Sequence, residues 1–142
     1  MKSKSTDELL AKVPLFEGLS AKEMREVSNL TTRMKLRAGR HLTEQGASGQ
    51  EFLVVLDGSV DVLIDGVVVA SPAAGQFYGE VALLDDSPRT ATVVAKTDVT
   101  VDIIGRREFA EMLDLQPQIA ERLRQAMAAH HPDDPAGAPD TM

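Results

Sequence analysis

Residues 76–95 read QFYGEVALLDDSPRTATVVA, and the rest of the chain is best understood from this stretch outward. Gly79 and Glu80 open a short apolar run typical of one helical turn, and an acidic loop leads to Pro88, Arg89 and a β-branched strand. The glycine allows the free backbone amides of such a turn to approach an anion, and an arginine can donate two parallel hydrogen bonds to a phosphate. The stretch therefore predicts a site for a small anion.

Glu80 narrows the kind of anion. A carboxylate repels a bound phosphate unless it accepts hydrogen bonds from another part of the same ligand, such as a ribose hydroxyl. The pair of Glu80 and Arg89 therefore favours a sugar phosphate over inorganic phosphate. Taken singly, Gly79 is an ordinary turn glycine, Glu80 a solvated acid and Arg89 a surface residue.

The whole string, however, resembles the phosphate-binding cassette of the cyclic nucleotide-binding domains. These domains occur in catabolite-activator-like regulators, cyclic-nucleotide-dependent kinases and gated channels. The matching segments are residues 79–84, GEVALL, and 88–93, PRTATV. Residues 14–19, PLFEGL, and the hairpin at 56–60, LDGSV, occur at the family's positions as well, so the resemblance covers about residues 14–127.

The resemblance implies a cyclic nucleotide, cAMP or cGMP, as the ligand, and no other cofactor or metal. Its phosphate would be held by one arginine side chain and nearby backbone amides: Arg89, Val81, Ala82 and Thr90. A singly charged phosphate diester suits these donors. The ribose would lie at Gly79 and Glu80, whose carboxylate would accept the 2′-hydroxyl.

The base would lie against Val62, Ala70 and Thr90, which match the family's base-facing positions. In the family, a hydroxyl at the position of Thr90 can bond the amino group of a syn guanine. Bacterial relatives with a hydroxyl there often bind cAMP. The resemblance therefore favours cAMP and keeps cGMP as the alternative.

Composition bounds the class of protein. A chain of 142 residues is expected to form one domain, and its lack of cysteine excludes disulfides, thiolate metal sites and a cysteine nucleophile. The net charge of -7 argues against binding nucleic acid or anionic membranes. No apolar run approaches the roughly 20 residues of a membrane span, and the N-terminus lacks the apolar region of a signal peptide, so a cytoplasmic protein is expected.

Residues 1–30 are expected to form an N-terminal helical segment. The pattern Ser-x-x-Glu, which is the capping box that begins many helices, occurs at Ser5 and again at Ser20. The first box predicts a helix over residues 5–13, ended by a proline, and the second predicts a helix to about Leu30.

Residues 31–105 are expected to form the cyclic nucleotide-binding β-barrel, because apolar residues alternate and turn signals recur about every ten residues. Residues 51–56 are apolar nearly throughout, which predicts a strand covered on both faces. The fold class is mainly β with flanking helices, an eight-stranded jelly roll (double-stranded β-helix) interrupted by one short phosphate-binding helix. The expected strands cover residues 32–37, 41–45, 51–56, 60–64, 67–69, 90–94 and 99–103.

Residues 106–129 are expected to form two helices, the second starting at Pro117, a favourable first position for proline. Ile119, Leu123 and Met127 lie four apart and predict an apolar stripe that docks on the barrel. The resemblance implies that these helices also act as a lid that repacks over a bound ligand. Residues 130–142 are rich in proline and acidic residues and predict a disordered tail.

These observations favour a sensor or regulatory domain that is not an enzyme. The chain ends soon after its last helix, which leaves no room for a helix-turn-helix, so direct DNA binding is not expected. Repacking of the C-terminal helices would instead signal in trans to an unidentified effector protein.

Three alternatives stay open. The first is an interaction module of the same fold that has no ligand. The second is a metal-dependent enzyme of the cupin type, which needs two or three histidines on strands, whereas His41 is the one histidine outside the tail. The third is a weak homodimer through the last helix, whose short stripe is marginal for self-association.

Overall fold

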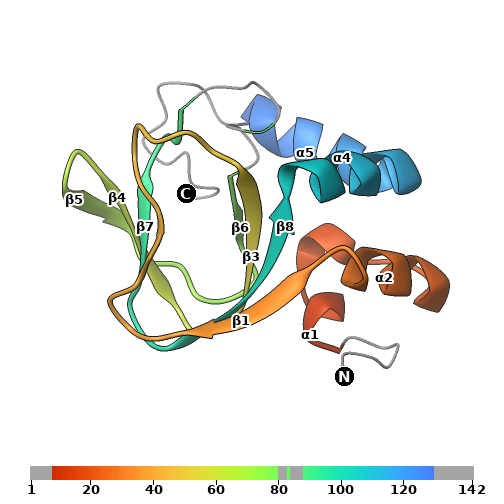
Figure 1. The fold of residues 1–142 in the computed structure, drawn as a ribbon, viewed down its shortest axis with the longest axis horizontal. Coiled ribbons are helices and arrows are strands. Elements are labelled where there is room, and N and C mark those ends of the chain that lie inside the picture. Colours follow the sequence, from red (N-terminus) through yellow and green to blue (C-terminus); the bar gives the residue numbers. More distant parts are fainter. Residues whose placement is uncertain (1–7, 80–82, 84–87, 130–142) are drawn as a thin grey trace.

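Two four-stranded antiparallel sheets form the centre of the structure, a computed structural model that describes residues 8–79, 83 and 88–129. The strand order is β1-β8-β3-β6 in one sheet and β2-β7-β4-β5 in the other. Figure 1 shows the helices gathered on the outer side of the first sheet, with the second sheet on its other side. The strands are β1 (Thr32–Leu36), β2 (His41–Thr43), β3 (Glu51–Asp57), β4 (Val60–Ile64), β5 (Val67–Ala70), β6 (Phe77–Tyr78), β7 (Thr92–Ala95) and β8 (Val99–Gly105).

Strand β3 is buried on both faces, as its apolar sequence predicts. Successive side chains of a strand point to opposite faces. Phe52 and Val54 accordingly pack into an apolar cluster shared with the helices. Leu53 and Val55 pack into a second cluster between the two sheets. One strand thus supplies both cores.

The helices before the sheets are α1 (Glu8–Ala11), the 3-10 helix η1 (Pro14–Phe16) and α2 (Ala21–Ser28). The predicted capping box at Ser20 is confirmed. The Glu23 amide donates to the Ser20 hydroxyl at 3.1 Å, and the Ser20 amide donates to the Glu23 carboxylate at 2.8 Å. The first helix ends at Ala11, two residues before its predicted end at residue 13, and Ser5 lies outside the described residues.

The helices after the sheets are α4 (Arg106–Leu115) and α5 (Pro117–Ala129), which begin where the sequence predicts. The ring of Phe109 in α4 packs against the ring of Phe52 in β3 in a tilted arrangement, with 4.9 Å between the ring centroids. Ile119 and Leu123 of α5 are buried in the helical cluster, so this part of the predicted stripe docks as expected. The side chain of Met127 lies outside the described residues.

The strand prediction missed one strand and misplaced the ends of others, since β2 ends at Thr43 instead of residue 45 and β8 extends to Gly105 instead of residue 103. Strand β6 was not expected, because its two residues are too few to show a periodicity, yet Phe77 and Tyr78 pair with Val54 and Leu53. Strand β7 begins at Thr92 instead of residue 90.

Candidate functional site

Gly79 follows β6 and has a backbone conformation that favours glycine, with φ at +100°. A Cβ atom there would lie 2.5 Å from the Glu51 carbonyl oxygen and would overlap the guanidinium of Arg89. The Gly79 carbonyl accepts a hydrogen bond from the Leu83 amide at 3.2 Å. Leu83 is itself buried in the apolar cluster shared with the helices, so Gly79 lies between this cluster and Arg89.

Arg89 lies with only 9% of its surface exposed. The interpretation of this residue as an ordinary surface arginine is therefore wrong. Its main chain is bonded to the loop between β2 and β3, where its amide donates to the Ala47 carbonyl at 2.8 Å and its carbonyl accepts from the Gly46 amide at 2.9 Å. Burying a guanidinium costs free energy, so an arginine in such a place requires anionic or carbonyl oxygens around it.

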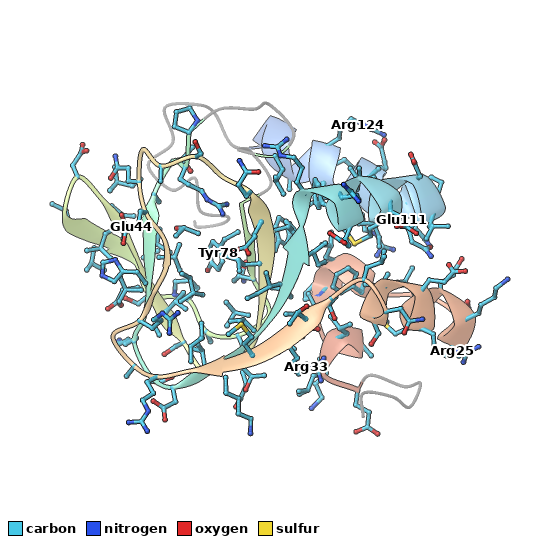
Figure 2. The ribbon with its side chains drawn as sticks, in the orientation of Figure 1. Arg25, Arg33, Glu44, Tyr78, Glu111 and Arg124 are labelled. Carbon is cyan, nitrogen blue, oxygen red and sulfur yellow. The ribbon has the colours of Figure 1, made fainter. Side chains whose placement is uncertain are left out.

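Val62 and Ala70 are directly opposed in the register of β4 and β5. Val62 is 2% exposed and belongs to the cluster between the sheets, and Ala70 packs against this cluster. Tyr78 belongs to the same cluster, and Figure 2 shows it in the interior between the sheets. The two predicted base-facing strand positions therefore lie side by side in the apolar cluster between the sheets.

The predicted site residues thus fall into four groups. Gly79 and Arg89 lie in contact, and Val62 and Ala70 are strand partners. Thr90 is exposed beside Arg89. The remaining predicted residues, Glu80, Val81 and Ala82, lie outside the described residues.

Sequence reasoning missed the residues that hold the arginine segment. The hydroxyl of Thr43 donates to the Ala91 carbonyl at 2.9 Å and accepts from the Val93 amide at 3.1 Å. Thr43 is 6% exposed. A polar residue inside a predicted strand gives no sign of its partner about 50 positions away, so only the tertiary structure identifies this role.

Arg122 and Arg124 of α5 both have hydrogen-bond partners within the chain. Arg122 donates to the Leu15 carbonyl of η1 at 2.7 Å. Arg124 is exposed and pairs with Glu121, and this hydrogen bond, with the positive charge of Arg124, lowers the pKa of the Glu121 carboxyl.

No group of three histidine, aspartate or glutamate side chains in the described part of the chain could hold a metal ion. His41 instead lies 2.6 Å from the Glu44 carboxylate, with both side chains exposed. Of the helices within residues 8–79, 83 and 88–129, none is long and apolar enough to cross a membrane.

The model of the cyclic nucleotide-binding domain matches residues 33–116, from β1 to the end of α4. The cAMP-dependent protein kinase regulatory subunit of Aspergillus fumigatus is 38% identical over 115 residues, which make up 80% of this chain and 28% of that protein. The chain therefore spans less than a third of this relative.

Two solved structures share the fold. One is the regulatory domain of Toxoplasma gondii PKA with cAMP, at a TM-score of 0.71 and 25% identity, with 84% of this chain and 48% of that chain covered. The other is the regulatory subunit of a cAMP-independent protein kinase A from Trypanosoma brucei, at a TM-score of 0.73 and 26% identity, with 83% and 44% covered. The chain belongs to the cyclic nucleotide-binding domain family.

Proposed function

We propose that this chain binds a cyclic nucleotide, with cAMP preferred over cGMP, and that Arg89 holds the phosphate. The observation that carries the proposal is the burial of Arg89 against Gly79. A nearly buried guanidinium whose backbone is fixed by a neighbouring loop is prepared to receive an anion. The backbone amides of Val81, Ala82 and Thr90 would complete the phosphate site.

The sugar and the base would occupy the two sides of this arginine. The ribose would lie at Gly79 and Glu80, and the Glu80 carboxylate would accept its 2′-hydroxyl. The base would lie on the apolar surface of Val62 and Ala70, with Thr90 at its edge. Two similar proteins support the preference for cAMP. The Aspergillus relative is named as the regulatory subunit of a cAMP-dependent protein kinase, and the Toxoplasma domain was solved with cAMP.

The output would be mechanical and not catalytic. Helices α4 and α5 would repack over the ligand as a lid. In this proposal the chain consists of an N-terminal helical segment (residues 1–30), a jelly-roll barrel made of the two sheets (31–105), the lid helices (106–129) and a tail (130–142). Ligand can drive such a change only through a higher affinity for the closed arrangement. Because the curated relative is a regulatory subunit of a kinase, we propose an effector protein in trans, such as a kinase catalytic subunit.

A second candidate is an interaction module that does not respond to cAMP. The similarity to the Trypanosoma regulatory subunit, which is named cAMP-independent, favours this alternative. The burial of Arg89 beside Gly79 weighs against it, because an arginine at this depth suits an anionic ligand.

Calorimetric titration of the purified chain with cAMP and with cGMP tests the proposal. Saturable binding of either nucleotide, with tighter binding of cAMP, is the expected result. Absence of heat with both nucleotides at millimolar concentration, repeated by NMR titration, would reject the proposed function and leave the interaction module. Tighter binding of cGMP would reverse the preference only.

A further inference from the structure

The segment that carries Arg89 is attached to the end of β2 by a run of hydrogen bonds between residues 43–47 and 89–93. At its outer end, Arg89 exchanges two main-chain bonds with Gly46 and Ala47. One step further in, the Gln45 amide donates to the Thr92 hydroxyl at 2.9 Å. The run therefore fixes the backbone on the C-terminal side of the arginine.

Thr43 forms the buried end of this run. The pairing of β2 with β7 shifts register between His41 and Thr43, which removes regular ladder bonds at this point. The Thr43 hydroxyl replaces them, because it accepts from the Val93 amide and donates to the Ala91 carbonyl. Thr43 and Val93 are 6% and 2% exposed, so water cannot readily take over the bond from the Val93 amide.

The position of the guanidinium depends on this backbone. Its contact with Gly79 is so close that the glycine could not carry a Cβ, so a small displacement of residues 89–93 would move the arginine against β6 or away from it. A displacement of about 1 Å is enough to lose much of the gain from a preorganised ligand contact. Gly46 and Ala47 are exposed loop residues, whereas Thr43 is buried, so the Thr43 hydroxyl is the better protected attachment of this segment.

We propose that Thr43 is a positioning residue of the nucleotide site: its hydroxyl holds the segment that aims Arg89 at the phosphate. This inference rests on the proposed function. Thr43 itself would not touch the ligand, and its effect would pass entirely through Arg89. Since every cyclic nucleotide carries the same phosphate, the effect would be equal for cAMP and cGMP.

The test compares three variants. Thr43→Val keeps the shape of the side chain and removes the hydroxyl, and Thr43→Ser keeps the hydroxyl. Thr97→Val is the matched control, because the Thr97 hydroxyl also accepts from a backbone amide, that of Ser59, and donates to a backbone carbonyl, that of Asp98, beyond the other end of β7. Calorimetry measures the affinity for both nucleotides, and thermal unfolding without nucleotide measures stability.

We expect Thr43→Val to weaken the binding of cAMP and cGMP about tenfold, because the substitution removes both hydrogen bonds of the hydroxyl and part of that loss reaches Arg89. Thr43→Ser is expected to bind within about twofold of the parent. Thr97→Val is expected to lower the melting temperature while its affinities also stay within about twofold. A purely structural role of Thr43 would change the melting temperature alone.

A double-mutant cycle with Arg89→Ala separates positioning from other routes. In that background, Thr43→Val is expected to cause no further loss of affinity, measured by NMR titration because binding is weak. A loss equal to that in the parent would overturn the route through Arg89. Should Thr43→Val not fold, Thr92→Val removes the adjacent exposed bond from the Gln45 amide and is expected to weaken binding about threefold.

The possible failures are distinguishable. If the parent binds cAMP and Thr43→Val, or in its place Thr92→Val, binds it equally well, this inference is wrong and the proposed function stands. If the parent binds neither nucleotide, the proposed function falls and this inference falls with it.

Discussion

The guanidinium of Arg89 occupies the space in which any side chain at Gly79 would have to lie. The two residues are ten positions apart, and a strand end and the start of another strand bring them together. The contact explains why this position needs a glycine and not merely a flexible residue. Substitution of either residue therefore tests this contact.

Replacement of Arg89 by alanine is expected to weaken cAMP binding by about 2–5 kcal/mol, or roughly thirtyfold to a few thousandfold, because the phosphate loses its charged partner. Stability without ligand is expected to change little. Calorimetry of Arg89→Ala beside Arg124→Ala, an exposed arginine of α5, provides the measurement and its control. Binding of Arg89→Ala with the parent's affinity would show that the phosphate lies elsewhere.

Replacement of Gly79 by alanine is expected to reduce both stability and cAMP affinity. Its positive φ alone costs an alanine about 1–2 kcal/mol, and the added Cβ must also displace Arg89. Gly39→Ala is the matched control, because Gly39 has a φ of +92° and a Cβ atom added there would meet nothing within 4 Å. Thermal unfolding and calorimetry should show a stability loss in both variants and an affinity loss in Gly79→Ala alone.

Glu80 provides a test of sugar recognition. Glu80→Ala is expected to bind cAMP more weakly and to lose most of the parent's discrimination against 2′-deoxy-cAMP, because the unpaired carboxylate is the source of that discrimination. Titrations of both ligands against both proteins give the ratio of affinities. Equal losses for the two ligands would rule out the ribose role.

The ion pair between Arg33 of β1 and Asp102 of β8 is expected to matter for stability and not for ligand binding. The guanidinium donates to both carboxylate oxygens, at 2.8 and 3.0 Å, and the Asp102 side chain is fully buried. Arg33→Ala would leave this buried charge without its partner in the pair, at a cost of about 3–5 kcal/mol. Chemical denaturation measures the loss, and a loss below about 1 kcal/mol would contradict the prediction.

Much of the fold could be predicted because its signals are local. The capping box at Ser20 lies within four residues, and the Asp65–Gly66 hairpin has positive φ values of 54° and 82°, which its sequence favours. The burial of β3 on both faces follows from its continuous apolar run. Strand β6 could not be predicted, since its two residues form a strand only through their pairing with β3.

By itself, the sequence determined the mainly-β class and the helices before and after the sheets, and it predicted the residues of the candidate site. These follow from periodicity, turn chemistry and a recognisable segment, all of which act over short distances. Only the tertiary structure decided that Arg89 is buried against Gly79, that Thr43 bonds the arginine's segment, and that Arg122 binds η1. The physical reason is that burial and hydrogen-bond partners depend on which distant segments pack together, and no local pattern in the chain records that choice.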